Sequence, residues 1–284
     1  MCMRCCDLIR LLRPIQWLKN LMIFFPPFLG GKLSHNGVLN FGLLPFIAFS
    51  VASSSTYVLN DILDRHNDAH HPDKRKRPLP SGRISIFTAY VLGGCCLILG
   101  LILALMVSRP FFIILLSYIV IQLLYSSTLK YIVVFDIFCI SAGFLLRLHA
   151  GGSVFNIEIS SWLFLSVFLL ALFLGTGKRL GEMNFLGDRA GEHRKTLTTY
   201  PPGFLEGVMY MTGGAVMVTY AMFVLSRHML VYTVPLCCFG LLRYVFRVKS
   251  GEGGDPTEAL TKDSNLLITA ILWTIMIWYA YYKQ

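Results

Sequence analysis

The sequence contains repeated apolar runs of about 20 residues, the length that an α-helix needs to cross a lipid bilayer. We expect about nine such spans, at residues 15–33, 38–60, 84–107, 110–129, 132–150, 160–178, 204–226, 228–248 and 263–283. Only 14% of the residues are charged, against about 25% in a typical soluble domain. A transmembrane β-barrel would need short alternating segments in place of these long runs. The sequence therefore predicts an all-α polytopic membrane protein.

The basic residues predict the orientation of this protein in the membrane. If the N-terminus is cytoplasmic, the connections near 61–83, 130, 179–203 and 249–262, with the adjoining helix turns, hold about 20 of the 25 Lys and Arg residues. The net charge of +10 is then explained by cytoplasmic loops, so we expect no nucleic-acid partner. The two longest polar loops are predicted to emerge on the same face, where they can share a site.

Three aspartates dominate the first long loop, at the end of the second predicted span. Asp61, Asp64 and Asp68 stand at i, i+3 and i+7 and follow Asn60, a spacing that places them on one face of a helix. Carboxylates this close repel one another unless a cation lies between them, and oxygen ligands suit Mg²⁺, which binds one or two carboxylates together with substrate phosphates. We predict a Mg²⁺ site at these aspartates. The alternative is a solvated acidic helix end.

Other polar residues near the loops are candidates for binding anionic groups. A basic cluster follows the aspartates and comprises Lys74, Arg75 and Arg77. Positive charge beside Mg²⁺ is what a diphosphate leaving group needs to stabilise its negative charge. Arg147 lies inside a predicted span, where a charged residue is costly and usually faces an internal partner. The remaining candidates are Lys19, which could be only an interfacial anchor, Lys130, and the second-loop residues Lys178, Arg179, Glu182, Asp188, Glu192, Arg194, Lys195 and Tyr200.

The segment 60–68 matches the N-D-x-x-D-x-x-x-D signature of the UbiA superfamily of intramembrane prenyltransferases, and the sequence resembles that superfamily. Within it, the sequence is most similar to the decaprenyl-phosphate phosphoribosyltransferase branch. The stretches that carry this similarity are 13–20 (R-P-x-Q-W-x-K-N), 71–78 (H-P-x-K-R-x-R-P), 143–152, 177–182 (G-K-R-x-x-E) and 194–197. The resemblance implies one UbiA-like transmembrane domain over residues 1–284.

The resemblance also implies an activity: Mg²⁺-dependent transfer of a 5-phosphoribosyl group from phosphoribosyl diphosphate to a polyprenyl phosphate. Such an enzyme would lie in a bacterial inner membrane, with its active site on the cytoplasmic face, and would supply a lipid-linked pentose for the cell envelope. The aspartates would hold Mg²⁺, with Asn60 orienting them. The substrate-binding residues would be Lys19, Lys74, Arg75, Arg77, Lys130, Arg147, Lys178, Arg179, Glu182, Arg194, Lys195 and Tyr200.

Alternatives to this activity stay open at the level of the sequence. The nearest is a UbiA-type prenyltransferase that moves a polyprenyl group to an aromatic or quinone precursor. Such enzymes carry a second aspartate-rich motif, for which this chain has Asp188 and Glu192 preceded by the pair Lys178 and Arg179. A transporter is disfavoured because the charges gather at the loops rather than at the midplane. A purely structural membrane scaffold is disfavoured to a similar degree. The sequence is also compatible with a homo-oligomer.

Overall fold

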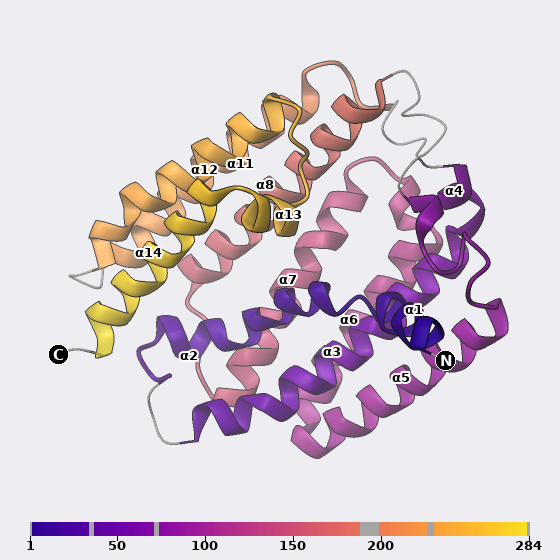
Figure 1. The fold of residues 1–284 in the computed structure, drawn as a ribbon. Coiled ribbons are helices and arrows are strands. Elements are labelled where there is room, and N and C mark those ends of the chain that lie inside the picture. The colour runs from indigo at the N-terminus through magenta and orange to yellow at the C-terminus, as the bar shows by residue number, and fades with distance from the viewer. Residues whose placement is uncertain (1, 34–36, 71–73, 188–198, 226–229, 283–284) are drawn as a thin grey trace. The chain divides into compact units, whose positions relative to one another are not determined.

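The computed structural model describes residues 2–33, 37–70, 74–187, 199–225 and 230–282. In this part all regular secondary structure is helical (Figure 1). The α-helices are α1 (Cys2–Leu12), α2 (Phe25–Leu29), α3 (Val38–Leu63), α4 (Arg65–His70), α5 (Ile86–Val107), α6 (Arg109–Ser127), α7 (Phe135–Phe155), α8 (Ser161–Leu186), α11 (Phe204–Leu225), α12 (Val234–Lys249), α13 (Pro256–Lys262) and α14 (Ser264–Tyr282). The 3₁₀ segments are η1 (Pro14–Phe24), η2 (Lys74–Lys76), η3 (Leu129–Tyr131) and η5 (Leu230–Thr233). The predicted all-α fold is confirmed.

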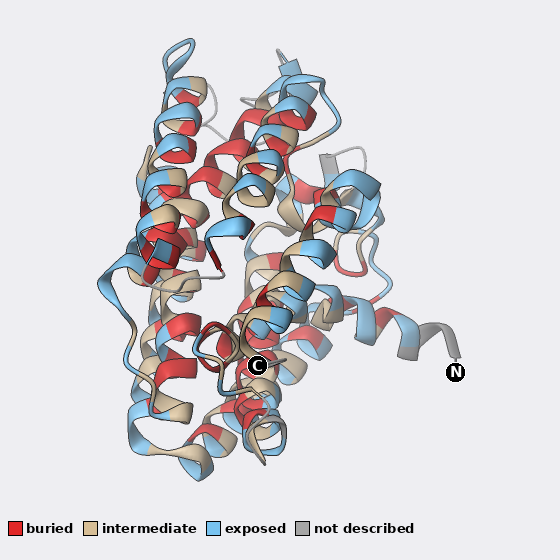
Figure 2. Ribbon diagram, turned by 90° about the vertical axis from the view of Figure 1, so that its left-hand side faces the viewer, coloured by how far each residue is buried: buried red, intermediate tan, exposed pale blue. Residues whose placement is uncertain are grey.

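Eight helical segments of the described chain are long and apolar enough to cross a membrane. They are Asn40–Leu63, Ile86–Val107, Arg109–Ser127, Phe135–Phe155, Ser161–Phe185, Phe204–Leu225, Leu230–Lys249 and Ser264–Tyr281. Large apolar side chains stay exposed on them, for example Phe87 and Met106 on α5, which are 77% and 68% exposed. Figure 2 shows that exposed positions recur along the long helices beside buried ones. An apolar outer surface of this extent faces lipid, and the protein is an integral membrane protein.

The first of the nine predicted spans, 15–33, differs from the prediction. The chain forms the 3₁₀ segment η1 over Pro14–Phe24 and then the short helix α2, in place of one long α-helix. Pro14 begins η1, and Pro26 and Pro27 lie in α2. Because proline has no backbone N–H and its ring clashes with the preceding turn, these residues interrupt the regular α-helical bonding. A hydropathic run alone did not reveal this break.

The chain divides into two compact units. Unit 1 comprises Met1–Phe28, His35–Ile132 and Leu146–Ile157. Small residues bring its helices into close contact: a Cβ atom added at Gly100 of α5 would lie 2.8 Å from the Cβ of Ala52 on α3. Such small residues allow membrane helices to pack backbone against backbone. Phe49 and Tyr118 fill the core beside this contact, with ring centroids 4.8 Å apart.

Unit 2 comprises Leu29–Ser34, Val133–Leu145 and Glu158–Gln284. Its core lies mainly between α8 and α11, where Phe173, Leu205 and Met209 are almost fully buried. The helix α7 contributes its first half to unit 2 and its second half to unit 1. The assignment of residues 1–284 to a single domain stays a prediction.

Candidate functional site

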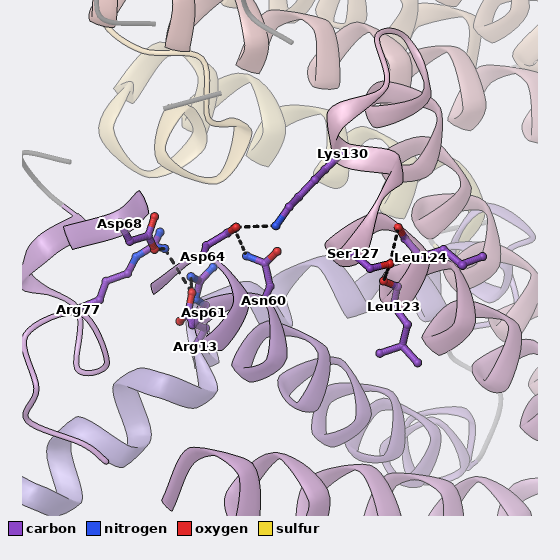
Figure 3. A network of polar contacts seen from close by, with 10 residues as sticks. All are labelled: Arg13, Asn60, Asp61, Asp64, Asp68, Arg77, Leu123, Leu124, Ser127 and Lys130. Atoms are coloured by element: carbon purple, nitrogen blue, oxygen red, sulfur yellow. Dashed lines mark hydrogen bonds and ion pairs between the residues drawn. The ribbon is translucent and has the colours of Figure 1, made fainter. Parts of the chain in front are cut away.

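Two aspartates of the motif, Asp61 on α3 and Asp68 on α4, are paired with arginines. In unit 1, Nη1 of Arg77 lies 2.6 Å from Oδ2 of Asp68 and 3.3 Å from Oδ1 of Asp61. The guanidinium group of Arg13 also pairs with Asp61. Both aspartates are nearly buried, with exposures of 2% for Asp61 and 5% for Asp68. Figure 3 shows these two carboxylates facing the same arginine, Arg77, so that both contact one positively charged group.

Asp64 belongs to a second, separate pairing. The α-helix α3 ends at Leu63, and the side chain of Asp64 turns toward η3, where Nζ of Lys130 lies 2.5 Å from Oδ1 (Figure 3). Nδ2 of Asn60 donates to the other oxygen at 3.0 Å. Lys130 is only 3% exposed. The three aspartates therefore do not share one face of a continuous helix, because the helix breaks at Asp64, between the end of α3 at Leu63 and the start of α4 at Arg65.

Arg147 faces internal partners of unit 1, as the sequence predicts for an arginine inside a span. Its Nε donates to Oδ1 of Asn20 at 2.7 Å, and its Nη2 donates to the hydroxyl of Tyr118 at 3.0 Å. The guanidinium carbon lies 4.6 Å from the ring centroid of Tyr118 and 5.2 Å from that of Phe49. Asn20 is fully buried and donates to Ser50. This cluster places a buried positive charge between aromatic rings and an amide.

In unit 2, Arg179 and Tyr200 meet at a buried acid, Asp136. Nε of Arg179 donates to Asp136 at 2.6 Å, and the hydroxyl of Tyr200 donates to the other carboxylate oxygen at 2.9 Å. Nη1 of Arg179 also binds Glu182 at 2.6 Å. Burial raises the pKa of Tyr200 to about 12; the neighbouring Asp136 charge acts in the same direction, and the Val134 N–H, which donates to the phenol oxygen, acts against it. Tyr200 therefore stays neutral at physiological pH.

Lys178 is the more accessible member of the predicted Lys178–Arg179 pair. Its Nζ lies 2.9 Å from Oδ2 of Asp255, and its side chain is 33% exposed, against 3% for Arg179. The other described candidates lie in unit 1: Lys74 and Arg75 on η2, and Lys19 on η1. Asp188, Glu192, Arg194 and Lys195 lie outside the described residues. The binding roles of all these residues, and one site shared by the two loops, stay predictions.

The UbiA prenyltransferase family matches residues 23–269 of this chain. The chain belongs to this family. Among curated relatives, the decaprenyl-phosphate phosphoribosyltransferase of Mycolicibacterium smegmatis is 31% identical, and the match covers 94% of this chain and 89% of that protein. The enzyme of the same name from Corynebacterium glutamicum is 32% identical, with coverages of 97% and 86%. The predicted membership is thus confirmed.

Solved structures of UbiA proteins show the same fold. A UbiA homolog from Archaeoglobus fulgidus, solved bound to GPP and Mg²⁺, matches with a TM-score of 0.76. The match covers 97% of this chain and 98% of that chain, at 24% sequence identity. The predicted UbiA-like bundle is thereby confirmed as a fold, whereas GPP and Mg²⁺ are ligands of the archaeal protein.

The acidic residues of this UbiA chain suit a divalent cation in their chemistry. Asp61 and Asp68 supply oxygen donors that converge on one cationic nitrogen of Arg77, and two carboxylates are a common Mg²⁺ ligand set. Within the part of the chain that the structure describes, no three His, Cys, Asp or Glu side chains form a group that could hold a metal. The fit therefore rests on two carboxylates, with Asp64 engaged by Lys130.

Three residues of these networks were not predicted to take part in them, although Arg13 and Asn20 lie in the stretch 13–20 that carries the resemblance. Arg13, the partner of Asp61, has a left-handed backbone with φ of 53°, a conformation that is uncommon for a residue other than glycine. Asn20 binds Arg147, and Asp136 binds Arg179. Asp136 is an isolated acid within an apolar run, and such an acid signals a buried basic partner. The partners of Arg13 and Asn20 have no comparable local signal.

Proposed function

We propose that this protein transfers the 5-phosphoribosyl group of phosphoribosyl diphosphate to a polyprenyl phosphate, with Mg²⁺ as cofactor. The observation that carries the proposal is the similarity, over nearly the full length, to enzymes named decaprenyl-phosphate phosphoribosyltransferase. The lipid product would serve as a pentose donor for the cell envelope, and the reaction would take place at the cytoplasmic face of a bacterial inner membrane.

The residues of unit 1 supply the groups that this reaction needs. We propose Asp61 and Asp68 as Mg²⁺ ligands, with Asp64 as a third ligand oriented by Asn60. Mg²⁺, when bound, would neutralise the diphosphate oxygens as negative charge grows on them. Arg77 and Arg13 lie beside the same carboxylates and can stabilise that charge directly.

The chemistry requires bond exchange at one carbon. An oxygen of the acceptor phosphate forms a bond to C1 of the ribose, the bond between C1 and the diphosphate oxygen breaks, and diphosphate leaves with the bonding electron pair. Since the acceptor phosphate is already anionic near neutral pH, no residue needs to remove a proton from it. We assign phosphate-binding roles to Lys74, Arg75 and Lys178, and the lipid chain would remain in the bilayer.

The test uses the purified protein in lipid nanodiscs with labelled phosphoribosyl diphosphate, polyprenyl phosphate and Mg²⁺. Formation of labelled lipid is the expected result. Product that forms only from an allylic diphosphate and an aromatic acid would overturn the proposal in favour of prenyl transfer.

A matched pair of variants tests the acidic residues. We expect Asp61→Asn to lower the turnover number at least about 100-fold, since it removes a proposed ligand of the Mg²⁺ that would neutralise the leaving diphosphate. The control is Asp7→Asn, which also removes a buried carboxylate of unit 1 that is paired with an arginine, Arg83 at 2.9 Å. Equal activity of the two variants would show that Asp61 has only a structural role.

A further inference from the structure

The segment 250–255, which joins α12 to α13 and is called the strap below, lies against α8. Gly177 and Gly181 stand one helical turn apart on α8. A Cβ atom added at Gly254 would lie 2.1 Å from the carbonyl oxygen of Gly177, and one added at Gly181 would lie 2.5 Å from the backbone nitrogen of Gly254. Backbone therefore touches backbone at both points, and only glycine permits this approach.

Side chains of α12 hold the strap in this place. The hydroxyl of Tyr244 lies 2.6 Å from the carbonyl oxygen of Gly254. Nη2 of Arg247 donates to the carbonyl oxygen of Glu252 at 2.8 Å, and Nη1 binds its carboxylate at 3.0 Å. The Gly-rich composition suggests a flexible connector, but these bonds fix the strap relative to α8 and α12.

Asp255 ends the strap and uses its two carboxylate oxygens for different tasks. Oδ1 caps α13, accepting hydrogen bonds from the backbone N–H of Thr257 at 3.0 Å and of Glu258 at 3.3 Å. Oδ2 accepts from Nζ of Lys178 at 2.9 Å. Because the cap immobilises the carboxylate, Oδ2 has a defined direction. A lysine side chain has four rotatable bonds, so a fixed partner restricts where its ammonium group can lie.

We propose that the strap, acting through Asp255, is a positioning element that places the ammonium group of Lys178 to bind a phosphate group of the donor substrate. This inference rests on the proposed function for the identity of that substrate. Asp255 is a positioning residue, since it acts through Lys178. The pair is accessible to a phosphate, with side-chain exposures of 33% for Lys178 and 25% for Asp255.

The decisive variant is Asp255→Asn. Asparagine caps a helix about as well as aspartate, so the start of α13 is retained while the charge facing Lys178 is lost. We expect KM for phosphoribosyl diphosphate to rise about 3- to 10-fold with kcat nearly unchanged, the size expected when one long side chain must be ordered during binding. Lys178→Met should raise KM at least as much, and the double variant should be no worse than Lys178→Met.

The control is Glu258→Gln, which removes a carboxylate from the same helix at a pair exposed to solvent, Glu258 with Lys262 at 3.0 Å. An unchanged KM in Asp255→Asn would overturn the inference. So would effects of Asp255→Asn and Lys178→Met on KM that add in the double variant. In either case the proposed function still holds if the wild-type protein makes phosphoribosyl lipid. If the wild type instead uses a prenyl diphosphate, the proposed function fails. KM for that donor is then measured in the wild type and the same four variants, with the same pattern expected.

Discussion

The hydroxyl of Tyr200 is expected to stabilise unit 2 rather than to contact a substrate. It donates to Oδ1 of Asp136 at 2.9 Å and accepts from the backbone N–H of Val134 at 3.0 Å. A hydrogen bond to a charged group contributes about 1.5–3 kcal/mol, and an unpaired buried N–H costs about 1–3 kcal/mol. Since Val134 is only half-buried, we expect Tyr200→Phe to lower the free energy of unfolding by about 2–4 kcal/mol.

The measurement is denaturant unfolding in detergent, followed by the circular dichroism of the helices. The change removes one oxygen and retains the ring, which stacks on Phe204 with centroids 5.7 Å apart, so packing is nearly preserved. The control is Tyr210→Phe on α11, whose side chain is 53% exposed. A loss no larger than that of the control would refute the reasoning, and a change in KM alone would assign Tyr200 to substrate binding.

Three further outcomes follow from the structure. Gly151→Ala should destabilise the protein by about 3 kcal/mol in the same assay, because the added Cβ would lie 2.1 Å from the carbonyl oxygen of Ile23; Gly214→Ala, where nothing lies within 4 Å, should not. Burial raises the pKa of Asp263, but the backbone N–H groups at the start of α14 that donate to its carboxylate, and the Arg243 guanidinium, outweigh burial and lower that pKa. Stability should therefore fall as the pH drops below about 4. Thermal unfolding should show a smaller fall in Asp263→Asn. Chelation of Mg²⁺ should abolish turnover, and added Mg²⁺ should restore it; activity that survives chelation would contradict the predicted cofactor.

The membrane spans could be predicted because length and composition determine them. Eight helices appear where the sequence predicts spans, each long enough to cross the hydrocarbon region. The first predicted span was wrong as a single α-helix, because hydropathy does not report backbone hydrogen bonding. Pro14, Pro26 and Pro27 each remove a donor there, and residues that read as one helix form η1 and α2.

The contacts among the candidate site residues were only partly predictable. The spacing of the aspartates correctly joined Asp61 and Asp68, which share Arg77. It placed Asp64 with them, but the partner of Asp64 is Lys130, 66 residues away in the sequence. The pair of Arg147 and Asn20 spans 127 residues. Spacing rules describe neighbours within one helix, so contacts between distant segments escape them.

The exposure of the basic residues separates two kinds of role among the candidates. A phosphate can bind a cation only by displacing or joining its present partner, and breaking a buried pair costs about 3–5 kcal/mol, whereas an exposed pair contributes about 0–1 kcal/mol. Arg179 is 3% exposed and binds two carboxylates, while Lys178 and Arg77 are 33% and 31% exposed. A phosphate therefore recruits Lys178, whose partner Asp255 is 25% exposed, at little cost. The carboxylate partners of Arg77 are only 3% and 7% exposed, so displacing them is more costly. The replacement of Arg179 by methionine should impair folding before it changes KM.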